Sequence, residues 1–171
     1  MPRELFILRH AKSDWGANAP NDFARPLAKR GKADAPKVGG WLYREGLVPD
    51  LVVSSPAERA RQTTRKMCKA MDYKEKRVVW DEEIYAAGTA ELLRVLARCP
   101  AGIRSLMLVG HNPGLEDLLS FLVGDDLEIP PNGKLLPTAA LARLEMPDDW
   151  SALEAGCAQL LSLQRPRDLG D

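Results

Sequence analysis

A run of apolar residues near the N-terminus, Leu5 to Leu8, ends directly in Arg9 and His10. The run is flanked by charge and is too short for a helix, so the segment Glu4–Leu8 predicts a strand buried on both faces. Strands of this kind occur in parallel sheets that are covered by helices. Because ligands bind at the carboxyl ends of such strands, Arg9 and His10 occupy a place where a functional site is expected.

The second histidine stands in a matching position. The segment 103–109 is another strand-like run, and it ends in Gly110-His111-Asn112-Pro113-Gly114. The chain contains only two histidines. Each could simply cap a strand or bind a backbone carbonyl, but their matched positions after buried strands favour a shared site.

Strand-like and helix-like segments alternate along the chain. This order predicts an α/β fold, a three-layer sandwich with a mostly parallel central sheet, helices on both faces and an antiparallel edge. We expect one domain over residues 1–171. The expected strands are 4–8, 51–54, 77–80, 103–109, 140–145 and 157–163, and the expected helices are 30–45, 55–71, about ten residues from 89, and 112–124.

Composition limits the kinds of partner. Lys and Arg total 24, as do Asp and Glu, so no net charge draws the chain to nucleic acid or to a membrane surface. The three cysteines (Cys68, Cys99 and Cys157) show no paired spacing, and no metal-binding or Walker-type motif is present. The N-terminus lacks the apolar region of a signal peptide. We therefore expect a cytoplasmic protein without metal or other cofactor, whose anion site is a local cluster of arginines.

Further polar residues follow the other predicted strands. Ser55 and Pro56 are typical of a helix start, which places Arg59 in the first turn, where it can reach over the end of strand 51–54. Arg25 lies in the long polar loop 13–27 and is either solvated or folded back over the site. Glu83 follows strand 77–80, where a solvated acidic turn is the alternative. The segment 125–138 either covers the site or only connects two elements.

These side chains together indicate phosphate chemistry. The parallel sheet would gather Arg9, His10, Arg59, Glu83 and His111 at one edge. A neutral imidazole is a competent nucleophile toward phosphorus, and guanidinium groups bind the oxygens of the phosphoryl group as it is transferred. This scheme requires no metal ion.

Several segments resemble the histidine phosphatase (phosphoglycerate-mutase-like) superfamily. Leu8-Arg9-His10-Ala11 is similar to its Arg-His-Gly signature, with Ala in place of Gly, and Ser54 to Thr63 and Gly110 to Pro113 are similar to two further blocks. Arg25-Pro26-Leu27 and the segment 134–140 resemble the short SixA-type phosphohistidine phosphatases. The resemblance implies that His10 is the phosphorylated nucleophile, that Arg9, Arg59 and His111 complete the phosphate pocket, and that Arg25 is a further ligand. Glu83, next to Glu82, aligns approximately with the acid of the larger relatives.

The leaving group separates the possible substrates. An alkoxide needs a proton from an acid, whereas imidazole, with a pKa of about 6.5, hardly does. A short chain leaves the site open to a phosphorylated protein, so we expect a phosphatase for protein phosphohistidine that releases inorganic phosphate. The alternatives are a phosphomonoesterase for a small phosphorylated metabolite, with Glu83 as the acid, and a non-catalytic phosphate-binding module.

Overall fold

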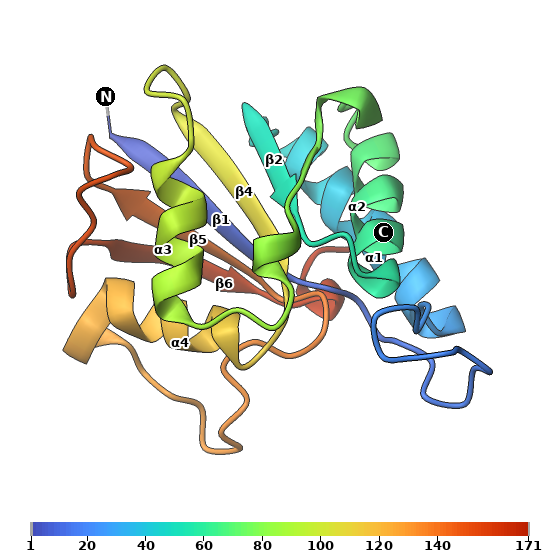
Figure 1. Cartoon of the computed structure of the whole chain (residues 1–171). Helices are drawn as coiled ribbons and strands as arrows, with labels where there is room; N and C mark the ends of the chain where they lie inside the picture. Colours follow the sequence, from blue (N-terminus) through green and yellow to red (C-terminus); the bar gives the residue numbers. More distant parts are fainter. Residues whose placement is uncertain (1, 171) are drawn as a thin grey trace.

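The computed structural model describes residues 2–170 and contains a mixed sheet of six strands (Figure 1). The strand order is β3-β2-β4-β1-β5-β6; the first four strands are parallel, and β5 and β6 are antiparallel to their neighbours. The mostly parallel sheet with an antiparallel edge is therefore confirmed. The strands are β1 (Arg3–Arg9), β2 (Leu51–Ser54), β3 (Val79–Trp80), β4 (Ser105–Gly110), β5 (Leu141–Met146) and β6 (Gln159–Gln164).

Helices cover both faces of this sheet, as the sequence predicts. In β1, Leu5 and Ile7 pack into a core with α3 and α4, whereas Phe6 and Leu8 pack into a second core with α1 and α2. This alternation follows from the two-residue period of a strand. The helices are α1 (Lys29–Arg44), α2 (Glu58–Ala70), α3 (Thr89–Ala97) and α4 (Gly114–Val123).

Helix α1 continues through Pro36 and the pair Gly39-Gly40. A Cβ atom at Gly39 would overlap the backbone carbonyl of Met67 in α2. Glycine lowers the helix propensity of the isolated segment, but here it permits the close approach of two helices.

Three local predictions were wrong. Ser55 is not the N-cap of α2, which begins at Glu58 after Ala57, and α4 begins at Gly114, two residues after the expected start at residue 112. The strand expected over 77–80 is restricted to Val79–Trp80, because Glu75–Arg77 forms a 3-10 turn. Ser55 and His111 therefore lie in loops, where their side chains can hydrogen-bond to groups other than a helix end.

The carboxyl ends of the parallel strands lie at one edge of the sheet. Arg9 pairs with Gly110, and Ser54 pairs with Val109, so the segments that follow β1, β2 and β4 emerge side by side. The loops 13–27 and 127–138 flank this edge, in dark blue and orange in Figure 1. Within residues 2–170, no helix is both long enough and apolar enough to cross a membrane.

Candidate active site

The two histidines are neighbours, as their matched positions in the sequence predict. His10 follows β1 and His111 follows β4, and the centroids of their rings are 5.2 Å apart with the planes tilted by 51°. The His10 backbone N–H also donates to the Gly110 carbonyl at 3.1 Å. The parallel register of β1 and β4 therefore fixes the separation of the rings.

The surroundings of His10 keep its imidazole neutral. Only 5% of His10 is exposed, and burial is the main cause that lowers its pKa to about 3, while His111, Arg59 and Arg9 lower it further. The ring atom Nδ1 lies 2.7 Å from the Ala11 carbonyl oxygen. Since a carbonyl can only accept, Nδ1 carries the proton, and the lone pair of the neutral ring is on Nε2.

Ala11, which replaces the glycine of the family signature, fits without strain. It is fully buried in the core below α1 and α2 and is not among the residues with positive φ. Its N–H donates to the Thr63 hydroxyl at 3.0 Å, and that hydroxyl donates to the Arg59 carbonyl. The site therefore accommodates the methyl group of Ala11.

His111 is held by a residue that we predicted to be a helix cap. Its Nε2 lies 2.7 Å from the hydroxyl of Ser55, and the ring stands edge-on to Tyr85 at a centroid distance of 5.5 Å. Burial and the charge of Arg59 lower the pKa of His111 to about 4. Both histidines are therefore neutral near pH 7.

Three arginines surround the histidines. Arg9, at the end of β1, donates to the Leu136 carbonyl at 3.1 Å, and burial lowers its pKa. Arg59, in the first turn of α2, is 5% exposed, and Arg25 is 8% exposed. All three are close enough to His111 to disfavour its protonation. Arg25 is thus folded back over the site and is not a solvated loop residue.

Asp22 joins two of these arginines and was missed by the sequence analysis. Its carboxylate accepts from Tyr85 Oη at 2.7 Å, from Arg59 at 3.0 Å and from Arg25 at 3.1 Å. The Tyr85 hydrogen bond is the largest cause of the lowered pKa of Asp22, which keeps it ionised. The only signals in the sequence were the spacing of Asp22 and Arg25 by three residues and the position of Tyr85 just after a strand end.

The site is rich in buried donors that lack a partner. In the described part of the chain, Arg9 Nε, Arg25 Nε and Arg59 Nε are buried donors without a hydrogen-bond acceptor, and His111 Nδ1 is a buried ring nitrogen without any hydrogen-bond partner. Burying an unsatisfied donor costs about 1–3 kcal/mol. An oxyanion among these residues would supply the missing acceptors and match their positive charge.

Glu83 does not lie with the other predicted residues. Its carboxylate binds Arg98 at 2.7 Å and Arg94 at 3.4 Å on the surface near α3, and it does not line the cavity beside His111. The hydrogen bond from Arg98 is the main cause that lowers its pKa. The expectation that Glu83 gathers with the histidines was wrong, because the turn Glu82–Ile84 directs it toward α3.

A cavity of about 480 Å³ opens beside His111. Its walls come from loop 13–27, α2, the segment that precedes α3 and the start of α4; the residues are Asp22, Arg59, Tyr85, Ala86, Ala87, Gly88, His111, Asn112, Pro113, Gly114 and Asp117. Arg59 is the single cation among them. A group bound to His111 and Arg59 can therefore extend into a space whose other charged residues, Asp22 and Asp117, are acidic.

Comparison with known proteins gives the family. Residues 5–85 match the model of the histidine phosphatase superfamily (branch 1). An uncharacterized protein of Mycobacterium tuberculosis is 32% identical over 164 residues, which cover 94% of this chain and all of that protein. An uncharacterized chloroplastic protein of Arabidopsis thaliana is 36% identical over 135 residues; the match covers 74% of this chain and 62% of the plant protein.

A solved structure of the same fold agrees with this result. The protein from Agrobacterium tumefaciens assigned as the phosphohistidine phosphatase SixA superposes with a TM-score of 0.82 at 32% identity, covering 97% of this chain and 99% of the other. The match spans the sheet, both helical layers and the loops that carry the two histidines. The chain therefore belongs to the histidine phosphatase superfamily, as a hydrolase whose fold matches that of the SixA phosphohistidine phosphatases.

Proposed function

We propose that this protein removes the phosphoryl group from protein phosphohistidine through a phosphorylated His10. The observation that carries the substrate class is the pairing of two carboxylates, Asp22 beside the arginines of the site and Glu83, the acid expected from the sequence, on the surface near α3. Asp22 and Glu83 both have lowered pKa values and are bound by arginines, so neither is suited to donate a proton at neutral pH. A leaving group that departs without a strong acid fits such a site best.

In the first step, His10 Nε2 attacks the phosphorus atom and the bond between phosphorus and the substrate imidazole breaks. Nδ1 keeps its proton and continues to donate a hydrogen bond to the Ala11 carbonyl, which stabilises the positive charge that develops on the ring. Arg9, Arg25 and Arg59 would bind the phosphoryl oxygens in this geometry. The other ring nitrogen of the substrate phosphohistidine takes a proton from solvent before the transfer, so the group that leaves is a neutral imidazole. Because its conjugate acid has a pKa of about 6.5, it needs no further proton from the enzyme.

In the second step, water attacks the phosphorus atom on His10, the bond to Nε2 breaks, and inorganic phosphate leaves. The Ser55 hydroxyl fixes the ring of His111 at 2.7 Å, so that its unpartnered Nδ1 is available to the phosphoryl group or to the water. The family match and the SixA structure from Agrobacterium tumefaciens support the same chemistry.

A phosphomonoesterase acting on an anionic metabolite is the alternative. The cavity beside His111 offers no cation other than Arg59 and contains Asp117, so a leaving group with further carboxylates or phosphates would meet repulsion. A neutral imidazole on a protein segment meets none.

The experiment compares rates on a phosphohistidine peptide, an aryl phosphate and an alkyl phosphate. The expected order of kcat/KM is phosphohistidine, then aryl, then alkyl, because the need for a proton on the leaving group rises in that order. Rapid acid-free quenching with mass spectrometry should place the trapped phosphoryl group on His10. An alkyl phosphate turned over as fast as phosphohistidine would favour the phosphomonoesterase, and phosphate binding without turnover of any substrate would indicate a binding module.

A further inference from the structure

A second cavity, of about 710 Å³, lies between α1, the segment 130–138 and the end of β6. Its walls carry five cationic residues and one acidic residue; the charged residues are Arg30, Lys37, Lys134, Arg165, Arg167 and Asp34. The whole chain has equal numbers of acidic and basic residues. Asp34 pairs with Arg30 and Lys37, and Asp168 pairs with Arg165, yet the cations of this basic groove still outnumber these carboxylates. The excess of positive charge is a local feature that the net charge does not explain.

The wall of the basic groove is continuous with the catalytic edge. Lys134 and Thr138 line the groove, and between them the Leu136 carbonyl accepts from Arg9 at 3.1 Å and from Asn112 at 2.8 Å. One residue beyond Thr138, the Ala139 N–H lies within hydrogen-bond distance of the Arg9 and His10 carbonyls. A molecule in the groove would thus lie beside the segment that supports the nucleophile.

The cations of the groove are exposed, unlike those around His10. The side chains of Arg30, Arg165 and Lys37 are 69%, 44% and 36% exposed, and Lys134 and Arg167 are also exposed. A tight site for a small anion needs converging, buried donors, and no such set is present among the described residues of the groove. Exposed, spread charges suit a larger anionic surface that approaches from solution.

Apolar residues accompany these charges. Pro130, Pro137 and Leu163 line the groove together with the buried Leu135, and Ile129, next to Pro130 in the chain, is 58% exposed. Interfaces between proteins combine an apolar centre with a polar rim in this way.

We infer that the basic groove docks an acidic segment of the phosphoprotein whose phosphohistidine reaches His10. The inference rests on the proposed function and adds to it how the protein substrate is selected. The charge excess favours an acidic partner, and the exposure of the cations favours a macromolecule over a free phosphate. The groove would lower KM for acidic substrates through electrostatic attraction and leave the chemical step unchanged.

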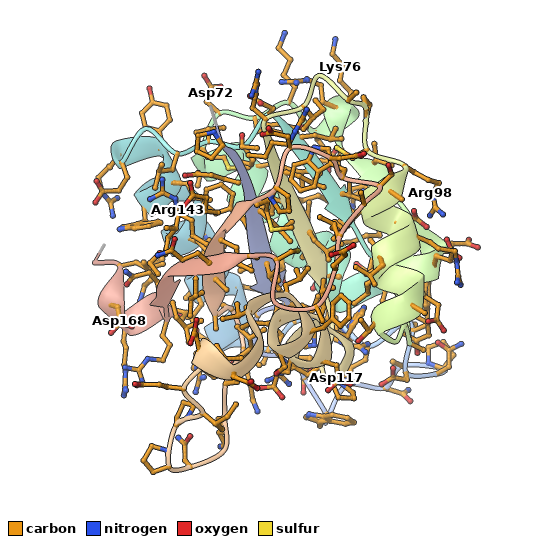
Figure 2. All side chains as sticks on the ribbon, turned by 90° about the vertical axis from the view of Figure 1, so that its left-hand side faces the viewer. Asp72, Lys76, Arg98, Asp117, Arg143 and Asp168 are labelled. Atoms are coloured by element: carbon orange, nitrogen blue, oxygen red, sulfur yellow. The ribbon has the colours of Figure 1, made fainter. Side chains whose placement is uncertain are left out.

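The test uses two phosphohistidine peptides of equal length, in which the residues around the phosphohistidine are either Glu or Gln. The groove variant is Lys134→Glu with Arg167→Glu. The matched control is Lys74→Glu with Lys76→Glu, which changes the net charge equally at exposed positions near the 3-10 turn Glu75–Arg77. Figure 2 places Lys76 at the opposite end of the molecule from Asp117 of the catalytic cavity and Asp168 beside the groove.

The wild type should show a lower KM for the Glu peptide than for the Gln peptide. The groove variant should raise KM for the Glu peptide about tenfold at low ionic strength, with kcat and the Gln peptide unaffected, and the effect should shrink in 0.5 M salt. Equal losses in the groove variant and its control, or equal losses on both peptides, would overturn the inference.

Binding of the unphosphorylated Glu peptide, measured by fluorescence anisotropy, separates this inference from the proposed function. If neither phosphopeptide is turned over, the proposed function fails, and weaker binding by the groove variant alone would still support the docking site. If the Gln phosphopeptide is turned over but the groove variant binds the Glu peptide as tightly as its control, only the docking inference fails.

Discussion

Two clusters of arginine and carboxylate lie near the carboxyl edge of the sheet, and they differ in burial. In the inner cluster, Asp22 binds Arg59 and Arg25, whose side chains are 6% and 10% exposed. In the outer cluster, Glu83 binds Arg98 and Arg94, whose side chains are 51% and 58% exposed. In the inner cluster, Asp22 accepts a hydrogen bond from Tyr85, and the charges of Asp22, Arg25 and Arg59 all act on His111.

The difference in burial indicates which of the two clusters is suited to bind an anion. A buried guanidinium without full pairing is costly, and Arg25 and Arg59 each keep one unpartnered buried nitrogen. The exposed arginines of the outer cluster are solvated, and their ion pairs contribute little. Burial of the arginine, and not the presence of a nearby carboxylate, therefore distinguishes the cluster for which we propose phosphate binding.

Removal of His10, the proposed nucleophile of the inner cluster, should lower activity more than any other change. His10→Ala should lower kcat/KM by at least about 10⁴-fold on an aryl phosphate. The other imidazole near the inner cluster, that of His111, is held by the Ser55 hydroxyl and cannot take the place of His10. Circular dichroism should show an unchanged fold. Turnover close to that of the wild type would show that the inner cluster serves another nucleophile.

Truncation of one arginine in each cluster compares them directly. Arg59→Ala should lower kcat/KM about 10²–10³-fold, which is typical for the loss of a donor to a transition-state oxyanion. Arg98→Ala, its exposed counterpart, should change kcat/KM less than twofold. Thermal unfolding of both variants separates lost catalysis from lost stability. Similar losses of kcat/KM in the two variants would contradict the conclusion that the buried arginine, and not the exposed one, serves catalysis.

The histidines of the inner site should also make stability depend on pH. Their folded pKa values, about 3 for His10 and about 4 for His111, lie below the unfolded value of about 6.5. The unfolded chain therefore binds protons first, and stability present above pH 6.5 is lost as the pH falls toward 4 and 3. Each histidine should cost about 2 kcal/mol between pH 8 and pH 5.

Urea unfolding at pH 8 and pH 5 measures this loss. In His10→Asn, the difference between the two pH values should fall by about half, whatever the absolute stability of the variant. An unchanged pH dependence would mean that His10 is not buried as a neutral ring.

The fold and the centre of the site were predictable from the sequence because both depend on strand periodicity. Apolar runs that end in Arg9-His10 and in Gly110-His111 predict parallel neighbours, and the register of β1 and β4 then brings the two rings together. The family motifs add Arg59. Each of these features can be recognised within a short stretch of the sequence, because polar residues follow directly after an apolar strand.

The errors arose where tertiary contacts override local patterns. Ser55 has the pattern of a helix cap, yet its hydroxyl lies 2.7 Å from His111, because the ring is available on the neighbouring strand end. Asp22 lies in a loop without regular structure, and its spacing of three residues from Arg25 does not show that Arg59 also binds its carboxylate. The position of Glu83 after a strand predicts that it joins the site, but it does not show that Arg98, directly after α3, pairs with it on the surface.

Neutralising Asp22 should have a smaller effect, which concerns the binding of phosphate to the inner cluster. Asp22→Asn keeps the size of the side chain and removes a negative charge from between Arg25 and Arg59. Inorganic phosphate should then inhibit several-fold more strongly, because the two guanidinium groups lose a competing anion. Inhibition constants at fixed ionic strength measure this, and weaker inhibition by phosphate would show that Asp22 positions the arginines more than it competes for them.

The smallest effect is expected for Glu83→Gln. The variant removes a carboxylate that Arg98 and Arg94 already hold on the surface, so it should change kcat/KM less than twofold on a phosphohistidine peptide and on an alkyl phosphate alike. The ratio of the two rates is the decisive quantity, because a proton donor matters more for the alkoxide. A loss confined to the alkyl phosphate would mean that Glu83 leaves the outer cluster during turnover and acts as the acid.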